Sequence, residues 1–136
     1  MAGSLASPSA RAAAAVDAAA LVAFVVVGVI QHDAGLAVAG IVRTGAPLLA
    51  AWFAVALVVG TYRRPGWLTL AITWAVGVPL GLVVRSAIRG GPWGRGLLVF
   101  GAVAMAFTLV FLVGGRLALL VASTVRRSRA ARVGPA

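Results

Sequence analysis

The sequence contains no cysteine and no lysine, and other side chains that could carry chemistry are scarce: two aspartates, Asp17 and Asp33, and one histidine, His32. The absence of cysteine excludes disulfides, thiolate metal sites and thiol catalysis. His32 and Asp33 are neighbours, but protein metal sites use three or more protein ligands. We therefore expect no metal site and no cofactor.

Long hydrophobic runs make up most of the chain. Of its 136 residues, 62% are hydrophobic and only 10% are charged, and the mean hydropathy is +1.09. Soluble proteins are about half apolar, whereas a run of about 20 apolar residues can cross a bilayer. The runs predict an all-α integral membrane bundle of four transmembrane helices, with spans at about 12–30, 44–61, 68–88 and 97–121. These spans form one domain, residues 12–122.

The net charge of +10 is carried by arginine. Binding to nucleic acid would need a basic face, but the arginines stand in short segments between apolar runs, so we expect no nucleic-acid partner. Because positively charged loops stay inside the cell, the side richer in arginine should be cytoplasmic, with both termini on it. That side would hold seven arginines against three: Arg11, Arg63, Arg64, Arg126, Arg127, Arg129 and Arg132 against Arg43, Arg89 and Arg95.

The two ends of the chain are predicted to lie outside the helical domain. Residues 1–11 are rich in serine, alanine and proline and predict a disordered cytoplasmic segment. Residues 123–136 predict a disordered basic tail on anionic lipid headgroups. A signal peptide cleaved near Ala39 is the alternative for the N-terminal part, but Asp17 would then interrupt its apolar core.

Asp17 and Arg116 stand near the ends of the first and fourth spans. With both termini on one side of the membrane, the two side chains should lie in the same leaflet. A charge alone in hydrocarbon costs about 2.5–3.5 kcal/mol on insertion scales, so we predict that they form a buried ion pair. Two alternatives remain open: Asp17 caps the first helix, or Arg116 reaches the headgroups by itself.

A second polar cluster is expected at the outer side of the membrane. It comprises His32, Asp33, Arg43 and Arg85, and its balance of charge is positive. We expect this cluster to bind a lipid headgroup or a small anion, with a solvated rim as the plainer interpretation. Ser86 is the serine in the same leaflet as His32, and nothing marks it as an activated nucleophile. The sequence therefore predicts a protein that is not an enzyme.

Small residues recur at helical spacing and predict close helix packing, within one chain or between copies in a homo-oligomer. The candidate packing residues are Gly77, Gly81, Gly101 and Gly115. The alternative function is a transporter or channel subunit. It would need a polar cavity between the third and fourth spans, lined by Thr73, Gly77, Pro79 and Thr108.

Helix-breaking residues set the expected boundaries of the second span. Gly35 and Gly40 predict an outer loop over residues 33–43, and Pro47 should lie in the first helical turn, where proline costs least. Trp52 falls near mid-span and should be wedged between helices. A smooth face for helix contact is expected from Ala46, Ala50 and Ala54.

The order of these residues resembles the family of short microbial membrane proteins known as domain of unknown function 3054. The resemblance covers Asp17 to Arg116. It is carried by Asp17, Phe24 and Gly28 before His32, by Arg43-Thr44 with Pro47, by Trp74 with Gly77 and Arg85, and by Gly114-Gly115-Arg116. The resemblance implies a four-helix integral membrane protein and implies no mechanism, because the activity of the family is not established.

Overall fold

The computed structural model describes residues 9–31, 38–91 and 93–132. Within these ranges the chain forms four α-helices and no strand: α1 (Ala10–Gln31), α2 (Val38–Val59), α3 (Trp67–Arg89) and α4 (Arg95–Arg132). Each helix is long and apolar enough to cross a membrane, and a helix satisfies its backbone hydrogen bonds internally, as hydrocarbon requires. The all-α, multi-pass membrane architecture predicted from the sequence is thus confirmed.

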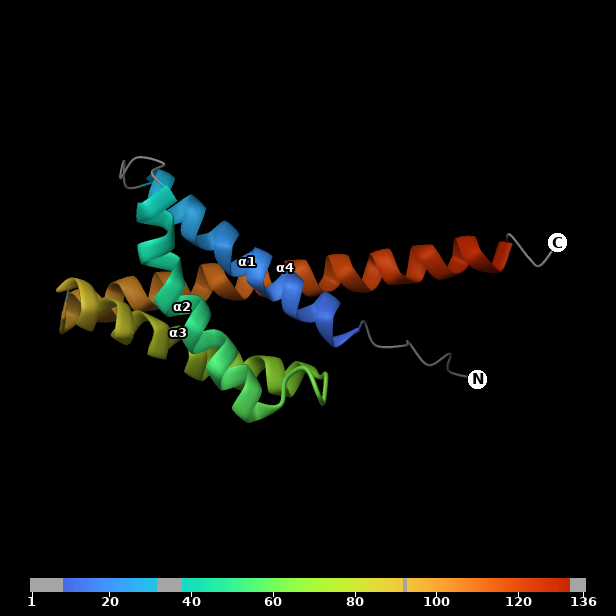
Figure 1. The fold of residues 1–136 in the computed structure, drawn as a ribbon, viewed down its shortest axis with the longest axis horizontal. Coiled ribbons are helices and arrows are strands. Elements are labelled where there is room, and N and C mark those ends of the chain that lie inside the picture. Colours follow the sequence, from blue (N-terminus) through green and yellow to red (C-terminus); the bar gives the residue numbers. More distant parts are fainter. Residues whose placement is uncertain (1–8, 32–37, 92, 133–136) are drawn as a thin grey trace.

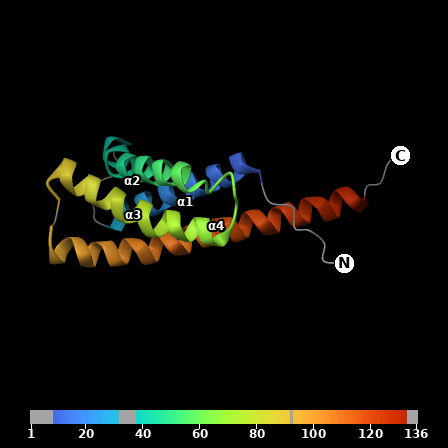
Figure 2. The ribbon, with the colours of Figure 1, turned by 90° about the horizontal axis from the view of Figure 1, so that it is seen from below.

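The four helices pack in a ring of neighbours. α2 lies along α3 and also contacts α1, while α4 contacts both α1 and α3. Figure 1 shows α1 crossing α4, and the two helices diverge toward the end of the bundle where α1 ends and α2 begins. Figures 1 and 2 both show the C-terminal part of α4 extending past the other helices.

Two glycines allow α2 and α3 to approach closely. A Cβ atom on Gly81 would lie 2.8 Å from the Cα atom of Leu48, and one on Gly77 would lie 3.3 Å from the Cα atom of Trp52. Larger side chains at these two positions would push the backbones apart. The indole of Trp52 is fully buried between the helices, as its mid-span position predicts.

The other two predicted packing glycines face α3 and α1. A Cβ atom on Gly115 would lie 2.8 Å from Cγ1 of Val16, and one on Gly101 would make an ordinary contact with Leu82 at 3.8 Å. All four glycines therefore face helices of the same chain, and any association between copies would use other surfaces. The predicted alanine face of α2 is instead exposed at all three positions, Ala46, Ala50 and Ala54.

The start of α2 differs from the sequence prediction. Residues 38–43, assigned to the outer loop, are helical, and Pro47 lies inside α2 rather than in its first turn. Residues 33–37, including Gly35, lie outside the described residues. The prediction gave Gly40 too much weight, because its neighbours are apolar and a glycine in an apolar segment costs only about 1 kcal/mol in a helix.

The end of α4 also differs. The predicted disordered tail is helical through Arg132, and residues 133–136 lie outside the description. Arginine and alanine dominate residues 126–132, and both are good helix formers. At the other end of the chain, α1 begins at Ala10. Ser9 caps it, since the amide of Ala12 donates to the Ser9 hydroxyl at 3.2 Å.

Candidate functional site

Asp17 and Arg116 meet where α1 crosses α4. The Nε and Nη2 atoms of Arg116 donate to the two carboxylate oxygens of Asp17, each at 2.7 Å. The Asp17 side chain is fully buried, and that of Arg116 is 12% exposed. The structure thus brings together the two residues that the sequence analysis paired. It does not place Asp17 at a helix cap, because α1 begins two turns earlier.

Tyr62 extends this pair into a network. Its hydroxyl donates to Oδ2 of Asp17 at 2.9 Å and accepts a hydrogen bond from the indole Nε1 of Trp52 at 3.0 Å. The Arg116 guanidinium carbon lies 5.9 Å from the centroid of the Tyr62 ring. Tyr62 lies in the turn after α2 and points inward to join the pair. This orientation follows a left-handed backbone conformation just after α2, where Gly60 has a φ of 77°. The hydrophobic periodicity of the sequence does not indicate this conformation.

The environment of Tyr62 keeps its hydroxyl protonated. Tyr62 lies in the turn between α2 and α3, and burial raises the pKa of its phenol well above the ordinary value, because the phenolate would lose its hydration. The negative charge of Asp17 raises the pKa further, while the hydrogen bond from Trp52 acts in the opposite direction. Tyr62 therefore remains a donor to Asp17, and the network ties α1, α4 and the α2–α3 turn together.

The polar cavity expected between the third and fourth spans is not formed by the predicted residues. Thr73 is fully buried, shares a hydrogen bond with Thr61 and donates to the carbonyl of its own helix at Thr69. Thr108 is also fully buried and donates to the carbonyl of Ala104 at 2.7 Å. These hydroxyls satisfy protein backbone groups, as buried hydroxyls in membrane helices commonly do.

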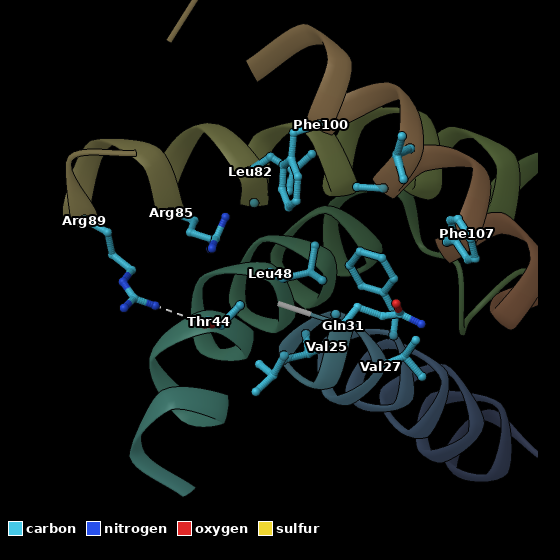
Figure 3. Close-up of a pocket in the computed structure, with 16 residues that line it drawn as sticks. Val25, Val27, Gln31, Thr44, Leu48, Leu82, Arg85, Arg89, Phe100 and Phe107 are labelled. Atoms are coloured by element: carbon cyan, nitrogen blue, oxygen red, sulfur yellow. Dashed lines mark hydrogen bonds between the residues drawn. The ribbon is translucent and has the colours of Figure 1, made fainter. Parts of the chain in front are cut away.

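A different cavity, of about 390 Å³, lies at the end of the bundle opposite to Asp17. We call it the α1–α4 cavity, because those two helices supply most of its lining, and α2 and α3 supply the rest (Figure 3). Most of its lining is apolar. The lining residues are Phe24, Val25, Val27, Gly28, Val29 and Gln31 of α1, Thr44 and Leu48 of α2, Gly81, Leu82, Arg85 and Arg89 of α3, and Phe100, Val103, Ala104 and Phe107 of α4.

Two arginines lie at one end of the α1–α4 cavity (Figure 3). The guanidinium carbon of Arg85 is 5.3 Å from the centroid of the Phe100 ring, a cation–π distance. Its Nε atom is buried and has no hydrogen-bond partner among the described residues. Arg89 donates from Nη1 to the hydroxyl of Thr44 at 3.0 Å. The cavity therefore combines an apolar wall with two cations and an unused donor.

The structure regroups the predicted outer cluster. Arg85 lines the cavity, whereas Arg43 is exposed on α2 and is not part of the lining. His32 and Asp33 lie outside the described residues. Arg89 was missed as a cavity residue, although it follows Arg85 by four residues and so lies on the same helix face. That step of four was the signal that could have grouped them.

Among the described residues, no three metal-ligating side chains gather in one place. The four apolar helices, the buried ion pair and the cavity define a multi-pass helical membrane protein. The sequence model of the family described as "Protein of unknown function (DUF3054)" matches residues 14–119, so the chain belongs to this family. No curated protein and no solved structure matches the chain.

Proposed function

We propose that this protein is a non-enzymatic membrane protein that binds an anionic headgroup or small anion at the arginine end of the α1–α4 cavity. The observation that carries the proposal is Arg85, whose buried Nε has no described hydrogen-bond partner. A guanidinium near hydrocarbon is costly unless it is neutralised, and a buried donor without a partner costs about 1–3 kcal/mol. An anionic oxygen at this position would relieve both costs.

The charge distribution around Arg85 supports an anion from outside the described chain. Arg89 adds a second positive charge one helical turn away and already donates to Thr44. Asp17, the acid in the described residues, is bound to Arg116 at the other end of the bundle. Arginine is well suited to this role, because its donors match the oxygens of carboxylate and phosphate groups.

The proposal includes an orientation in the membrane. The segments that flank the Asp17 end of the bundle carry more arginines than those that flank the cavity. The positive-inside rule then gives cytoplasmic termini and a cavity at the outer leaflet. Anionic headgroups at the level of the outer interface would reach Arg85 and Arg89 there.

The proposal that the protein is not an enzyme is based on the side chains that line the cavity. The described lining offers two arginines, one threonine and one glutamine as its polar groups. None of these is a usual nucleophile paired with a base, and acid–base catalysis needs a group that titrates near neutral pH. The cavity is therefore suited to holding an anion rather than transforming it.

Native mass spectrometry of the detergent-solubilised protein tests the proposal. The protein is offered phosphatidylglycerol, which is anionic, and phosphatidylcholine, which is zwitterionic, with identical chains. We expect retention of phosphatidylglycerol over phosphatidylcholine, and Arg85→Gln should remove this preference while Arg43→Gln, on the exposed face of α2, keeps it. Equal retention of the two lipids, together with no retention of inorganic phosphate by the unaltered protein, would rule the proposal out.

A further inference from the structure

We propose that the anion held at Arg85 is the headgroup of a membrane lipid, and that one apolar chain of this lipid lies inside the α1–α4 cavity. This inference rests on the proposed function and goes further, because it names the class of ligand. A small water-soluble anion would use only the arginine end of the site. A lipid chain would also use the rest.

The first argument is the size and lining of the cavity. Its volume of about 390 Å³ lies near the lower end of the range of about 300–1,000 Å³ for ligand sites. Apart from the two arginines, Thr44 and Gln31, the lining is formed by phenylalanine, valine, leucine, alanine and glycine. An apolar wall of this kind favours an apolar occupant over water. The volume suits one chain rather than a whole two-chain lipid.

The second argument is that the cavity opens sideways, between α1 and α4. Val27 of α1 is 38% exposed, and Val103 and Phe107 of α4 are 51% and 52% exposed, although all three line the cavity. These residues therefore form its rim. In a bilayer the rim would face lipid chains, so a chain could enter from the membrane without crossing water.

The third argument is the order of polar and apolar groups along the cavity. Arg85 lies over Phe100, and the α4 wall continues from Phe100 to Phe107. Seven residues of helix span roughly 10 Å. The cavity thus places a cation at one end of about 10 Å of apolar wall, which is the order of charge and chain in an anionic lipid.

Gly28 provides a direct way to fill the apolar part. It lines the cavity from α1, and a Cβ atom built on it would meet nothing within 4 Å. The first carbon of a longer side chain would therefore meet no neighbouring helix, and Gly28→Leu should occupy part of the chain site. Gly114→Leu is the matched control, because Gly114 is also within a helix, has equally open space around its Cβ position and does not line the cavity.

The experiment measures binding of single-chain phosphatidylglycerols with 6, 8 and 10 carbons, below their micelle concentrations, to the full-length protein in amphipol. Each methylene that leaves water for the cavity should raise the affinity about fourfold, which corresponds to about 0.8 kcal/mol. Protein-free amphipol gives the background partition. We expect the chain-length dependence above background in the unaltered protein and in Gly114→Leu, and its loss in Gly28→Leu.

A photoreactive single-chain phosphatidylglycerol, with a diazirine at the chain end, gives a second measurement on the unaltered protein. Labelling of residues 24–28 and 103–107 supports the inference, and labelling confined to the exposed outer faces of the bundle overturns it.

If Arg85→Gln abolishes headgroup preference while chain length and Gly28→Leu have no effect, the lipid-chain inference fails and the proposed anion binding stands. If chain length and Gly28→Leu matter but Arg85→Gln changes nothing, the ligand is not held as an anion, and both proposals fail.

Discussion

Removal of the negative charge at Asp17, with Arg116 left in place, should destabilise the bundle by about 3–5 kcal/mol, the cost of breaking a buried ion pair from one side. Asp17 is fully buried and receives two hydrogen bonds of 2.7 Å from Arg116. Asp17→Asn keeps the size of the side chain and an oxygen for the Tyr62 hydroxyl. It leaves the guanidinium of Arg116, whose side chain is only 12% exposed, without its counter-ion.

The double variant separates the pair from the two single residues. In Asp17→Asn with Arg116→Gln no charge is left to neutralise, so part of the loss in each single variant should be recovered. We expect the double variant to be about 2–3 kcal/mol more stable than the sum of the two single losses predicts, within the range measured for contacting residues. Insertion scales give about 2.5–3.5 kcal/mol for one charge at the centre of a membrane helix, which is an upper value for Asp17 and Arg116 because they lie near the ends of their spans.

The assay is reversible unfolding in mixed micelles of a mild detergent and dodecyl sulfate, followed by tryptophan fluorescence. Trp52 is fully buried and hydrogen-bonded to Tyr62, so its emission should report loss of the network. Arg63→Gln is the control, because Arg63 is exposed and should change stability by less than about 0.5 kcal/mol. Additive losses, with a coupling energy below about 0.5 kcal/mol, would refute the view that Asp17 and Arg116 stabilise the fold as a pair.

Three further predictions follow from other parts of the structure. Tyr62 is the single tyrosine, and its pKa is higher in the folded than in the unfolded protein. The phenol of the unfolded protein therefore ionises first, so the free energy of unfolding should fall as the pH rises above about 10. The same measurement on Tyr62→Phe should not show this fall. Gly81→Ala should cost about 1–3 kcal/mol in the micelle assay, because its Cβ would lie 2.8 Å from a backbone atom of α2, whereas Gly40→Ala, with open space around it, should be neutral or stabilising. A cysteine introduced as Ser128→Cys into this cysteine-free chain should react with an impermeant maleimide only after the cell membrane is opened, and labelling of intact cells would contradict cytoplasmic termini.

The membrane class, the four helices and the contact between Asp17 and Arg116 could be predicted because the sequence has few polar residues within its apolar runs and few acidic residues. Water cannot dissolve four apolar runs of this length, so hydropathy alone gives the spans. With two acids in the sequence, an arginine within a span has few counter-ions to choose from. Orientation then placed Asp17 and Arg116 in one leaflet, although they are 99 residues apart in the sequence.

The other parts could not be predicted because they depend on side-chain direction and on helix crossing. The inward turn of Tyr62 follows a left-handed backbone conformation at Gly60. The α1–α4 cavity requires two helices to touch at Gly115 and diverge beyond it. Neither feature leaves a periodic pattern. The helix boundaries at Val38 and Arg132 were misjudged for a different reason, since Gly40 was given too much weight at one end and the helix propensity of arginine and alanine too little at the other.

Each end of the bundle contains an arginine that is at least partly buried, and the two charges are stabilised differently. At one end Arg116 is neutralised within the chain by Asp17, and the helices α1 and α4 are held together there. At the other end the same two helices separate, and Arg85 has the face of Phe100 but no described carboxylate, while Asp33 lies outside the described residues. A cation–π contact contributes about 0.5–2 kcal/mol, less than the cost of a charge alone in hydrocarbon. The rest of the cost of the Arg85 charge is therefore not offset by the described residues, and Arg85 lies beside an open apolar cavity. The headgroup of an anionic lipid would neutralise Arg85, and the acyl chain of that lipid would fill the space between α1 and α4.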